Sequence, residues 1–185
     1  MTFENTIREL EQSRIIKHGT EPQYFLNGLC DGIPYINPTV LKELSDYIAS
    51  IIPSQDIDRI VCVEAMGIPI ATVLSCHLNI PLTIIRKKRY NLPTEYEITQ
   101  NTSYKKNKKL YINGLTENMN ILLIDDVIST GNTIREIIKG LTDLKINILH
   151  TVILVEIINK YYKKDINYTS LLQIKIKNDK VEVIK

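Results

Sequence analysis

The sequence has few cysteines, no long apolar run and no excess of charge of one sign, and these absences exclude several classes of protein. Cys30, Cys62 and Cys76 are never spaced C-x-x-C, so neither a disulfide framework nor a zinc site is predicted. The formal net charge is +2, from 23 basic and 21 acidic residues, which argues against nucleic acid or a membrane as partner. The longest apolar runs fall far below the ~18 residues that suggest a membrane span.

The sequence also lacks an internal repeat, a low-complexity tract or a linker. Its first 17 residues are charged throughout and do not resemble a signal peptide. The missing disulfide pattern favours the reducing cytoplasm. With 185 residues, 44% of them hydrophobic and 24% charged, the composition is that of an ordinary globular protein. We therefore expect a single domain over residues 1–185.

The most informative stretch is residues 121–133, with the sequence ILLIDDVISTGNT. A short unbroken aliphatic run, Ile121 to Ile124, is typical of a strand buried on both faces of a parallel sheet. Asp125 and Asp126 follow it, and a loop of small residues then leads into an amphipathic segment, 134–144. Open α/β sheets bind ligands at this carboxyl end of their strands. The sequence therefore predicts an α/β fold with its chemistry at this edge.

The loop that follows the two acids is suited to a phosphate monoester. Gly131 lets the backbone approach closely, the hydroxyls of Ser129, Thr130 and Thr133 can donate, and amides at a helix start favour an anion. Asn132 stands where a Walker loop needs Lys, and a dinucleotide fingerprint needs three glycines where this loop has one. A sugar phosphate therefore fits, and the alternative is a buried strand that ends in a solvated acidic turn.

Helical and strand patterns alternate along most of the chain. Residues 1–20 show the spacing of one amphipathic helix, and residues 22–36 predict a loop-rich lid or a strand pair. The remaining predicted elements are a helix from Asn37-Pro38 to Pro53, strands at 59–64 and 81–85 around a helix at 68–77, a strand at 147–156, and a hairpin over 171–184.

Residues 86–112 combine a basic run with a polar segment. Arg86 to Arg89 follow a predicted strand, and taken alone they can be a solvated basic run. Residues 90–109 are polar and weakly patterned, which inside a compact domain usually indicates a mobile functional loop. Residues 109–112 are expected to pair back as a strand.

At residues 125–133 the sequence resembles the 5-phosphoribosyl-1-diphosphate (PRPP) motif of type I phosphoribosyltransferases. The resemblance implies a central parallel sheet flanked by helices, a small hood built here from 22–36, and a flexible loop, 93–108, that includes Ser103 and Tyr104. It assigns Asp125 and Asp126 as the catalytic acids that hold and polarise the ribose. It assigns the 5′-phosphate to Ser129, Thr130, Gly131, Asn132 and Thr133.

Residues 64–67, with the sequence EAMG, resemble the family's pyrophosphate loop, where a non-proline cis peptide is often found. Pyrophosphate carries several negative charges, so cations and backbone amides should converge on it. The residues assigned to it are Ala65, Met66, Gly67, Arg86, Lys87 and Arg89, whereas Glu64 is interpreted as structural. The resemblance also implies Mg²⁺ held through PRPP oxygens and water, so no set of protein metal ligands is predicted.

Residues 64–71, 86–87 and 110–114 look most like those of archaeal hypoxanthine/guanine phosphoribosyltransferases. This implies purine salvage, in which PRPP and hypoxanthine or guanine give IMP or GMP, by a homodimer. Leu29, Cys30 and Val127 would line the base. The pattern Arg86-Lys87-Lys88 with Leu92-Pro93 resembles adenine enzymes, which leaves AMP formation as an alternative. A PRPP-sensing regulator is a further alternative, but it would need a DNA-binding appendage, and residues 1–20 predict only one helix.

Overall fold

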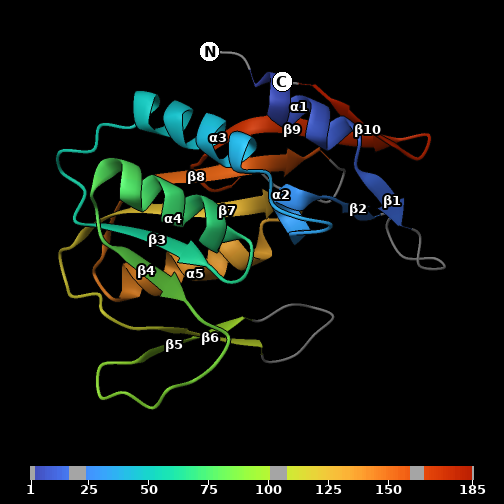
Figure 1. Ribbon diagram of the computed structural model, residues 1–185. Helices are drawn as coiled ribbons and strands as arrows, with labels where there is room; N and C mark the ends of the chain where they lie inside the picture. Colours follow the sequence, from blue (N-terminus) through green and yellow to red (C-terminus); the bar gives the residue numbers. More distant parts are fainter. Residues whose placement is uncertain (1–2, 17–23, 101–107, 159–164, 185) are drawn as a thin grey trace.

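A six-stranded sheet organises the computed structural model, which describes residues 3–16, 24–100, 108–158 and 165–184 (Figure 1). The strand order is β10-β9-β8-β7-β3-β4. All neighbours run parallel except β10, which is antiparallel to β9 at one edge. The strands are β3 (Arg59–Val63), β4 (Leu82–Ile85), β7 (Asn120–Ile128), β8 (Asn147–Ile157), β9 (Thr169–Lys177) and β10 (Lys180–Val183). The predicted α/β fold and the carboxyl-terminal hairpin are confirmed.

Strand β7 lies in the interior of the sheet, between β3 and β8. The side chains of Ile121 to Ile124 are completely buried, as expected for a strand covered on both faces. The strand continues further than the aliphatic run, because its pairing with β8 extends through Asp125 to Ile128. Both acids therefore belong to a paired strand and not to a turn.

Helices cover the two faces of the sheet. On one face lie α1 (Glu4–Glu11), α3 (Pro38–Ile51) and α4 (Gly67–Leu78), and α5 (Asn132–Asp143) lies on the other (Figure 1). Helix α3 begins as predicted, since the side chain of Asn37 accepts a hydrogen bond of 3.0 Å from the amide of Thr39.

The amino-terminal prediction of one helix over residues 1–20 is wrong beyond Glu11. Arg14–Ile16 form β1, which pairs antiparallel with β2 (Tyr24–Leu26). Beyond Leu10 the helical spacing consisted of charged residues, Arg14 and Lys17, which do not supply the apolar face that packs a helix on the core. The apolar residues Ile15 and Ile16 satisfy their backbone groups in the strand pair instead. Residues 17–20 lie outside the described part.

The segment predicted as a lid or strand pair contributes β2 and a short helix, α2 (Gly28–Asp31). The side chain of Asn27 caps this helix by accepting a 2.8 Å hydrogen bond from the amide of Cys30. Gly32 ends it with a φ of 70°, in the left-handed region that favours glycine. Helix α2 contacts β7, near the end of the strand that carries the two acids (Figure 1).

A second hairpin, β5 (Tyr96–Gln100) with β6 (Lys108–Ile112), lies beside the main sheet. The prediction of an unstructured mobile loop over 90–109 is therefore wrong for residues 96–100. Ile98 alternates with polar neighbours and packs on Gly140 of α5, so this stretch has the pattern of a strand. Ser103 and Tyr104 lie outside the described residues, so their assignment to a flexible loop stays a prediction.

Candidate active site

The two acids of β7 form the floor of a cavity of about 640 Å³ at the carboxyl end of the sheet. Burial above all raises the pKa of Asp125 well above its usual range, and the charge of Asp126 raises it further. Burial also raises the pKa of Asp126, to which nearby Asp31 contributes. The amide of Asp126 donates to Oδ1 of Asp125 at 3.1 Å, which orients the first carboxylate. Two such carboxylates can accept hydrogen bonds from a pair of sugar hydroxyls.

The predicted phosphate loop joins β7 to α5 and encloses a smaller cavity of about 200 Å³, lined by residues 127–134 with Asp125 and Ile153. Gly131 is the N-cap residue, with a φ of 77°, and no side chain of the described residues caps the helix there. The first amides of α5 are therefore available to an anion, and the neighbouring Ser129 and Thr130 are exposed. Asp125, Val127 and Thr133 line both cavities, so a phosphate and the sugar that carries it can bind side by side.

Arg135 holds this loop, a role that sequence reasoning missed. Its guanidinium donates to the carbonyl of Thr130 at 3.2 Å and to the side chain of Asn132 at 2.9 Å. Nε also donates to the carboxylate of Asp165, at 2.7 Å and 2.9 Å. The guanidinium thus ties Thr130 and Asn132, on either side of Gly131, to the carboxylate of Asp165.

We expect Arg135→Ala to weaken ribose 5-phosphate binding about 10-fold, because the loop must then be ordered by the ligand itself. Isothermal titration calorimetry would measure the dissociation constant. Lys139→Ala is the matched control, since Lys139 is an exposed cation on the same helix. Equal affinities for wild type and Arg135→Ala would show that the loop is ordered without the guanidinium.

The predicted pyrophosphate loop follows β3, the strand next to β7. The peptide bond between Glu64 and Ala65 is cis, as the family resemblance implied. Ala65 and Met66 line the larger cavity, and Gly67 begins α4 directly beneath it. A Cβ on Gly67 would lie 3.3 Å from Oδ1 of Asp125, so only glycine allows this approach without displacing the carboxylate.

The predicted cations are distributed unevenly around the cavity. Lys87 lines it directly. Arg86 forms an ion pair with Glu64, at 3.0 Å between Nε and Oε2, and Arg89 approaches Glu95 at 3.6 Å. The other oxygen of Glu64 accepts from the amide of Lys87. Glu64, interpreted as structural from the sequence, therefore positions both neighbouring cations, which agrees with that interpretation and makes it specific.

The wall of the larger cavity includes two residues of the β5–β6 hairpin that were not assigned to it. All residues that line it are Val63, Glu64, Ala65, Met66, Lys87, Lys109, Leu110, Asp125, Asp126, Val127 and Thr133. Val127 thus lies where a base-contacting residue was expected. Leu29 and Cys30 do not, because they are only 4% and 6% exposed and belong to the core beneath α2. The structure does not bring these two side chains to the cavity.

Two polar groups of the hood, a phenol and a carboxylate, form a hydrogen-bonded pair. The hydroxyl of Tyr24 donates to Oδ1 of Asp31, and Oδ2 of Asp31 accepts from the amide of Asn27 at 3.0 Å. Burial, together with this hydrogen bond, raises the pKa of Tyr24, and Asp126 contributes to the rise. The hood thus presents a donor and an acceptor that are bonded to each other, within electrostatic reach of Asp126.

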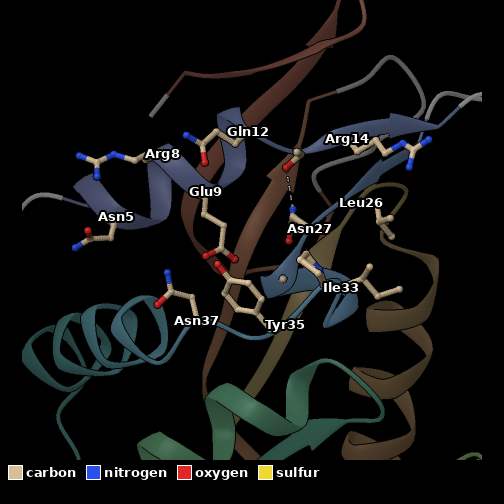
Figure 2. Close-up of a pocket in the computed structure, with 13 residues that line it drawn as sticks. Asn5, Arg8, Glu9, Gln12, Arg14, Leu26, Asn27, Ile33, Tyr35 and Asn37 are labelled. Atoms are coloured by element: carbon tan, nitrogen blue, oxygen red, sulfur yellow. Dashed lines mark hydrogen bonds between the residues drawn. The ribbon is translucent and has the colours of Figure 1, made fainter.

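A separate cavity of about 530 Å³ lies on the outer side of α2, between α1 and residues 33–37 (Figure 2). It shares no lining residue with the larger reaction cavity. Glu9, Tyr35 and Asn37 point into it, whereas Arg8 and Arg14 point away (Figure 2). Burial raises the pKa of Glu9, against hydrogen bonds from Asn37 and the Leu29 amide. Oε1 of Glu9 has no hydrogen-bond partner among the described residues.

Comparison with known proteins agrees with this geometry. Residues 35–184 match the family described as phosphoribosyl transferase domain. The chain belongs to the type I phosphoribosyltransferases. The loops after β7 and β3 are those that the sequence predicts to be the PRPP motif and the pyrophosphate loop.

Relatives with curated names are similar to this phosphoribosyltransferase over most of its length. The hypoxanthine/guanine phosphoribosyltransferase of Methanobrevibacter ruminantium is 47% identical over 154 residues, which are 83% of this chain and 81% of the relative. That of Methanohalophilus mahii is 39% identical over 181 residues, which are 96% and 94% of the two chains.

Solved structures of phosphoribosyltransferases share the fold. The adenine phosphoribosyltransferase of Saccharomyces cerevisiae has a TM-score of 0.72 at 18% identity. The aligned region covers 91% of this chain and 97% of the yeast chain. That of Leishmania donovani has a TM-score of 0.71 at 19% identity, with 92% and 79% covered. At such identities the likeness supports the architecture and carries no information about the base.

Two further findings concern the described part of this phosphoribosyltransferase. It holds no group of three or more His, Cys, Asp or Glu side chains arranged to bind a metal ion. None of its described helices is long and apolar enough to cross a membrane.

Proposed function

We propose that this protein is a purine-salvage enzyme that transfers the 5-phosphoribosyl group of PRPP to hypoxanthine or guanine. The products are IMP or GMP and pyrophosphate. The observation that carries the proposal is the meeting of three groups at one edge of the sheet. These are the uncapped helix start after β7, the paired acids Asp125 and Asp126, and the loop after β3 together with Lys87, which follows β4. The names of relatives at 39% and 47% identity support the choice of base.

The ribose phosphate would bind across β7 and its loop. The 5′-phosphate accepts hydrogen bonds from the amides of Asn132 and Thr133 and from nearby hydroxyls. The ribose hydroxyls donate to Asp125 and Asp126, which fixes the ring over the cavity floor. As the bond from C1′ to the pyrophosphate oxygen breaks and the bond to the purine nitrogen forms, the base loses its imidazole N–H proton, which leaves with the pyrophosphate. Positive charge that develops on the ribose ring is stabilised by these carboxylates.

The leaving pyrophosphate would lie against the loop of Ala65 and Met66, near Lys87 and Arg86. Mg²⁺, which the family typically uses with PRPP, would neutralise further charge. The donor set fits such an ion, because Mg²⁺ often binds through substrate phosphates and water with only one or two carboxylates. Asp125 and Asp126 are the carboxylates within reach.

The base would lie between Val127 and the hood. Hypoxanthine presents an acceptor at O6 and a donor at N1, and adenine presents the reverse. The Tyr24 hydroxyl carries one proton, which it donates to Oδ1 of Asp31 in the free protein. On binding it would turn from Asp31 to donate to O6, and the Asp31 oxygen released in this way would accept from N1–H. Guanine adds a second donor at N2 that the same carboxylate can accept. This arrangement favours 6-oxopurines.

We expect kcat/KM for hypoxanthine to exceed that for adenine by at least about a hundredfold. A site arranged for one hydrogen-bonding pattern leaves buried groups unpaired with the other, and such mismatches reach about 10⁴-fold. Initial rates with PRPP and adenine, hypoxanthine, guanine, xanthine or orotate would test this. A preference for adenine would overturn the choice of base and leave the PRPP site intact, whereas no turnover with any base would overturn the proposed function.

Three expectations from the sequence stay predictions. They are a single domain over residues 1–185 with its hood and flexible loop, a cytoplasmic location, and a homodimer. Light scattering on the purified protein would test the last of them.

A further inference from the structure

The larger cavity contains a lysine that no assignment above explains. Lys109 lines it together with Lys87, Asp125 and Asp126. Lys87 follows β4, whereas Lys109 comes from β6, so the two cations approach the cavity from separate elements. Two cations that line the same cavity favour a ligand with more negative charge than one phosphate monoester carries.

The position of Lys109 is fixed by the root of the hairpin. Arg86 and Tyr111 exchange backbone hydrogen bonds of 2.9 Å and 2.7 Å, which fasten β6 to the end of β4. Lys109 precedes Tyr111 by two residues, so both side chains lie on one face of β6, about 7 Å apart along the strand. Its side chain therefore extends beside the residues already assigned to pyrophosphate.

Two of the cations that follow β4, Arg86 and Arg89, are each paired with a glutamate of the protein. Glu64 pairs with Arg86 and Glu95 with Arg89, and both glutamates also accept backbone amides. The backbone amides therefore keep these two carboxylates in place even if the arginine side chains move away.

The pair of Lys109 with Glu97 is different. Nζ of Lys109 lies 2.7 Å from Oε1 of Glu97, and their side chains are 47% and 32% exposed. No described group other than Lys109 bonds to the carboxylate of Glu97. The hydrogen bond to Glu97 raises the pKa of Lys109, so the amine stays a cation. An exposed pair of this kind contributes little to stability and exchanges partners at low cost.

We propose that Lys109 is a further pyrophosphate-binding residue, and that its ammonium leaves Glu97 for the diphosphate of PRPP when the substrate binds. This rests on the proposed function. Glu97 holds the side chain at the cavity wall in the free enzyme and competes with the ligand for it. The ligand class is therefore a diphosphate, and the nucleoside monophosphate product does not engage Lys109.

The test compares calorimetric affinities for inorganic pyrophosphate, PRPP and IMP among variants. Lys109→Ala should weaken pyrophosphate and PRPP about 10- to 50-fold and leave IMP within about twofold, as expected for one lost charge-assisted contact. Lys109→Arg should restore most of the loss, and Glu97→Gln should tighten pyrophosphate about threefold. Lys145→Ala is the matched control, because Lys145 forms a similar 3.0 Å pair with Glu117 away from the cavity. Arg86→Ala is the positive control.

The outcomes separate this inference from the proposed function. Unchanged pyrophosphate affinity in Lys109→Ala, with normal binding by the wild type, overturns the role of Lys109 alone. Equal losses for pyrophosphate and IMP also overturn it, because they indicate a structural role. A wild type that binds neither pyrophosphate nor PRPP overturns the proposed function and this inference with it.

Discussion

Replacing Gly131 by Val is expected to lower the affinity for PRPP by about 10²- to 10⁴-fold. The loop offers several amides to the phosphate, and losing two charge-assisted hydrogen bonds costs about 3–6 kcal/mol. A branched side chain at a φ of 77° both strains the backbone and fills the space where the phosphate approaches. Calorimetry with PRPP and with ribose 5-phosphate would measure the loss, and both ligands should be affected alike.

Gly114→Val is the matched control for this prediction. Gly114 has a φ of 74° and an added Cβ would meet no atom within 4 Å, so the variant carries the same backbone strain outside the phosphate loop. Thermal unfolding of the two variants should therefore shift by similar amounts, while only Gly131→Val loses PRPP. Undiminished PRPP affinity in Gly131→Val would refute the assignment of the loop.

Asp125→Asn and Asp126→Asn are each expected to reduce kcat by about 10²–10⁴-fold, because the developing charge on the ribose loses a carboxylate. The variants keep the shape of the side chain, so PRPP should still bind. Asp58→Asn is the matched control. Its carboxylate accepts a 2.8 Å hydrogen bond from the amide of Asn120 at the other end of β7, away from the cavity. Full activity in both site variants would remove the acids from the mechanism.

The same substitution at Asp125 should stabilise the fold at neutral pH. Burial raises the pKa of Asp125 in the folded protein above its ordinary value, so its contribution to stability is complete below the ordinary pKa and is lost as the pH rises through the raised one. The ionised carboxylate therefore destabilises the native state at pH 7–8. Thermal unfolding should show Asp125→Asn more stable than wild type there, and the difference should shrink as the pH falls toward 4.

Much of this fold was predictable because strong local patterns coincide with tertiary demands. The aliphatic run 121–124, the cap at Asn37 and the alternation in 171–184 each indicate one structure, and the fold agrees with all three. The errors lie where a local pattern was weak. Residue 14 continues a helical spacing with a charged side chain, and residues 96–100 alternate between polar and apolar side chains only briefly. Both segments become strands because they pair with partners elsewhere in the sequence.

The site divides in the same way. The motif 125–133 predicts a ribose-phosphate site from sequence because its residues are contiguous, and this assignment stays a prediction. Arg135 and Lys109 are ordinary surface cations by sequence, and only the fold shows that one holds the loop and the other lines the cavity. Leu29 and Cys30 were assigned to the base by position in the motif, but the turn of α2 directs them into the core.

The adjacency of β3 and β7 has a consequence for which sugars the enzyme accepts. The loops that follow these strands would hold the two charged ends of PRPP, and neighbouring strands are spaced by about 4.8 Å through their backbone hydrogen bonds. The distance between the two loops is therefore set by the main chain of the sheet and not by side chains. Point mutations in the loops can weaken binding of the 5′-phosphate or of the pyrophosphate without changing the distance between the two groups that the site accepts. Tolerance should therefore be low for a four- or six-carbon sugar, and higher for changes in the base, which is read by an element outside the sheet.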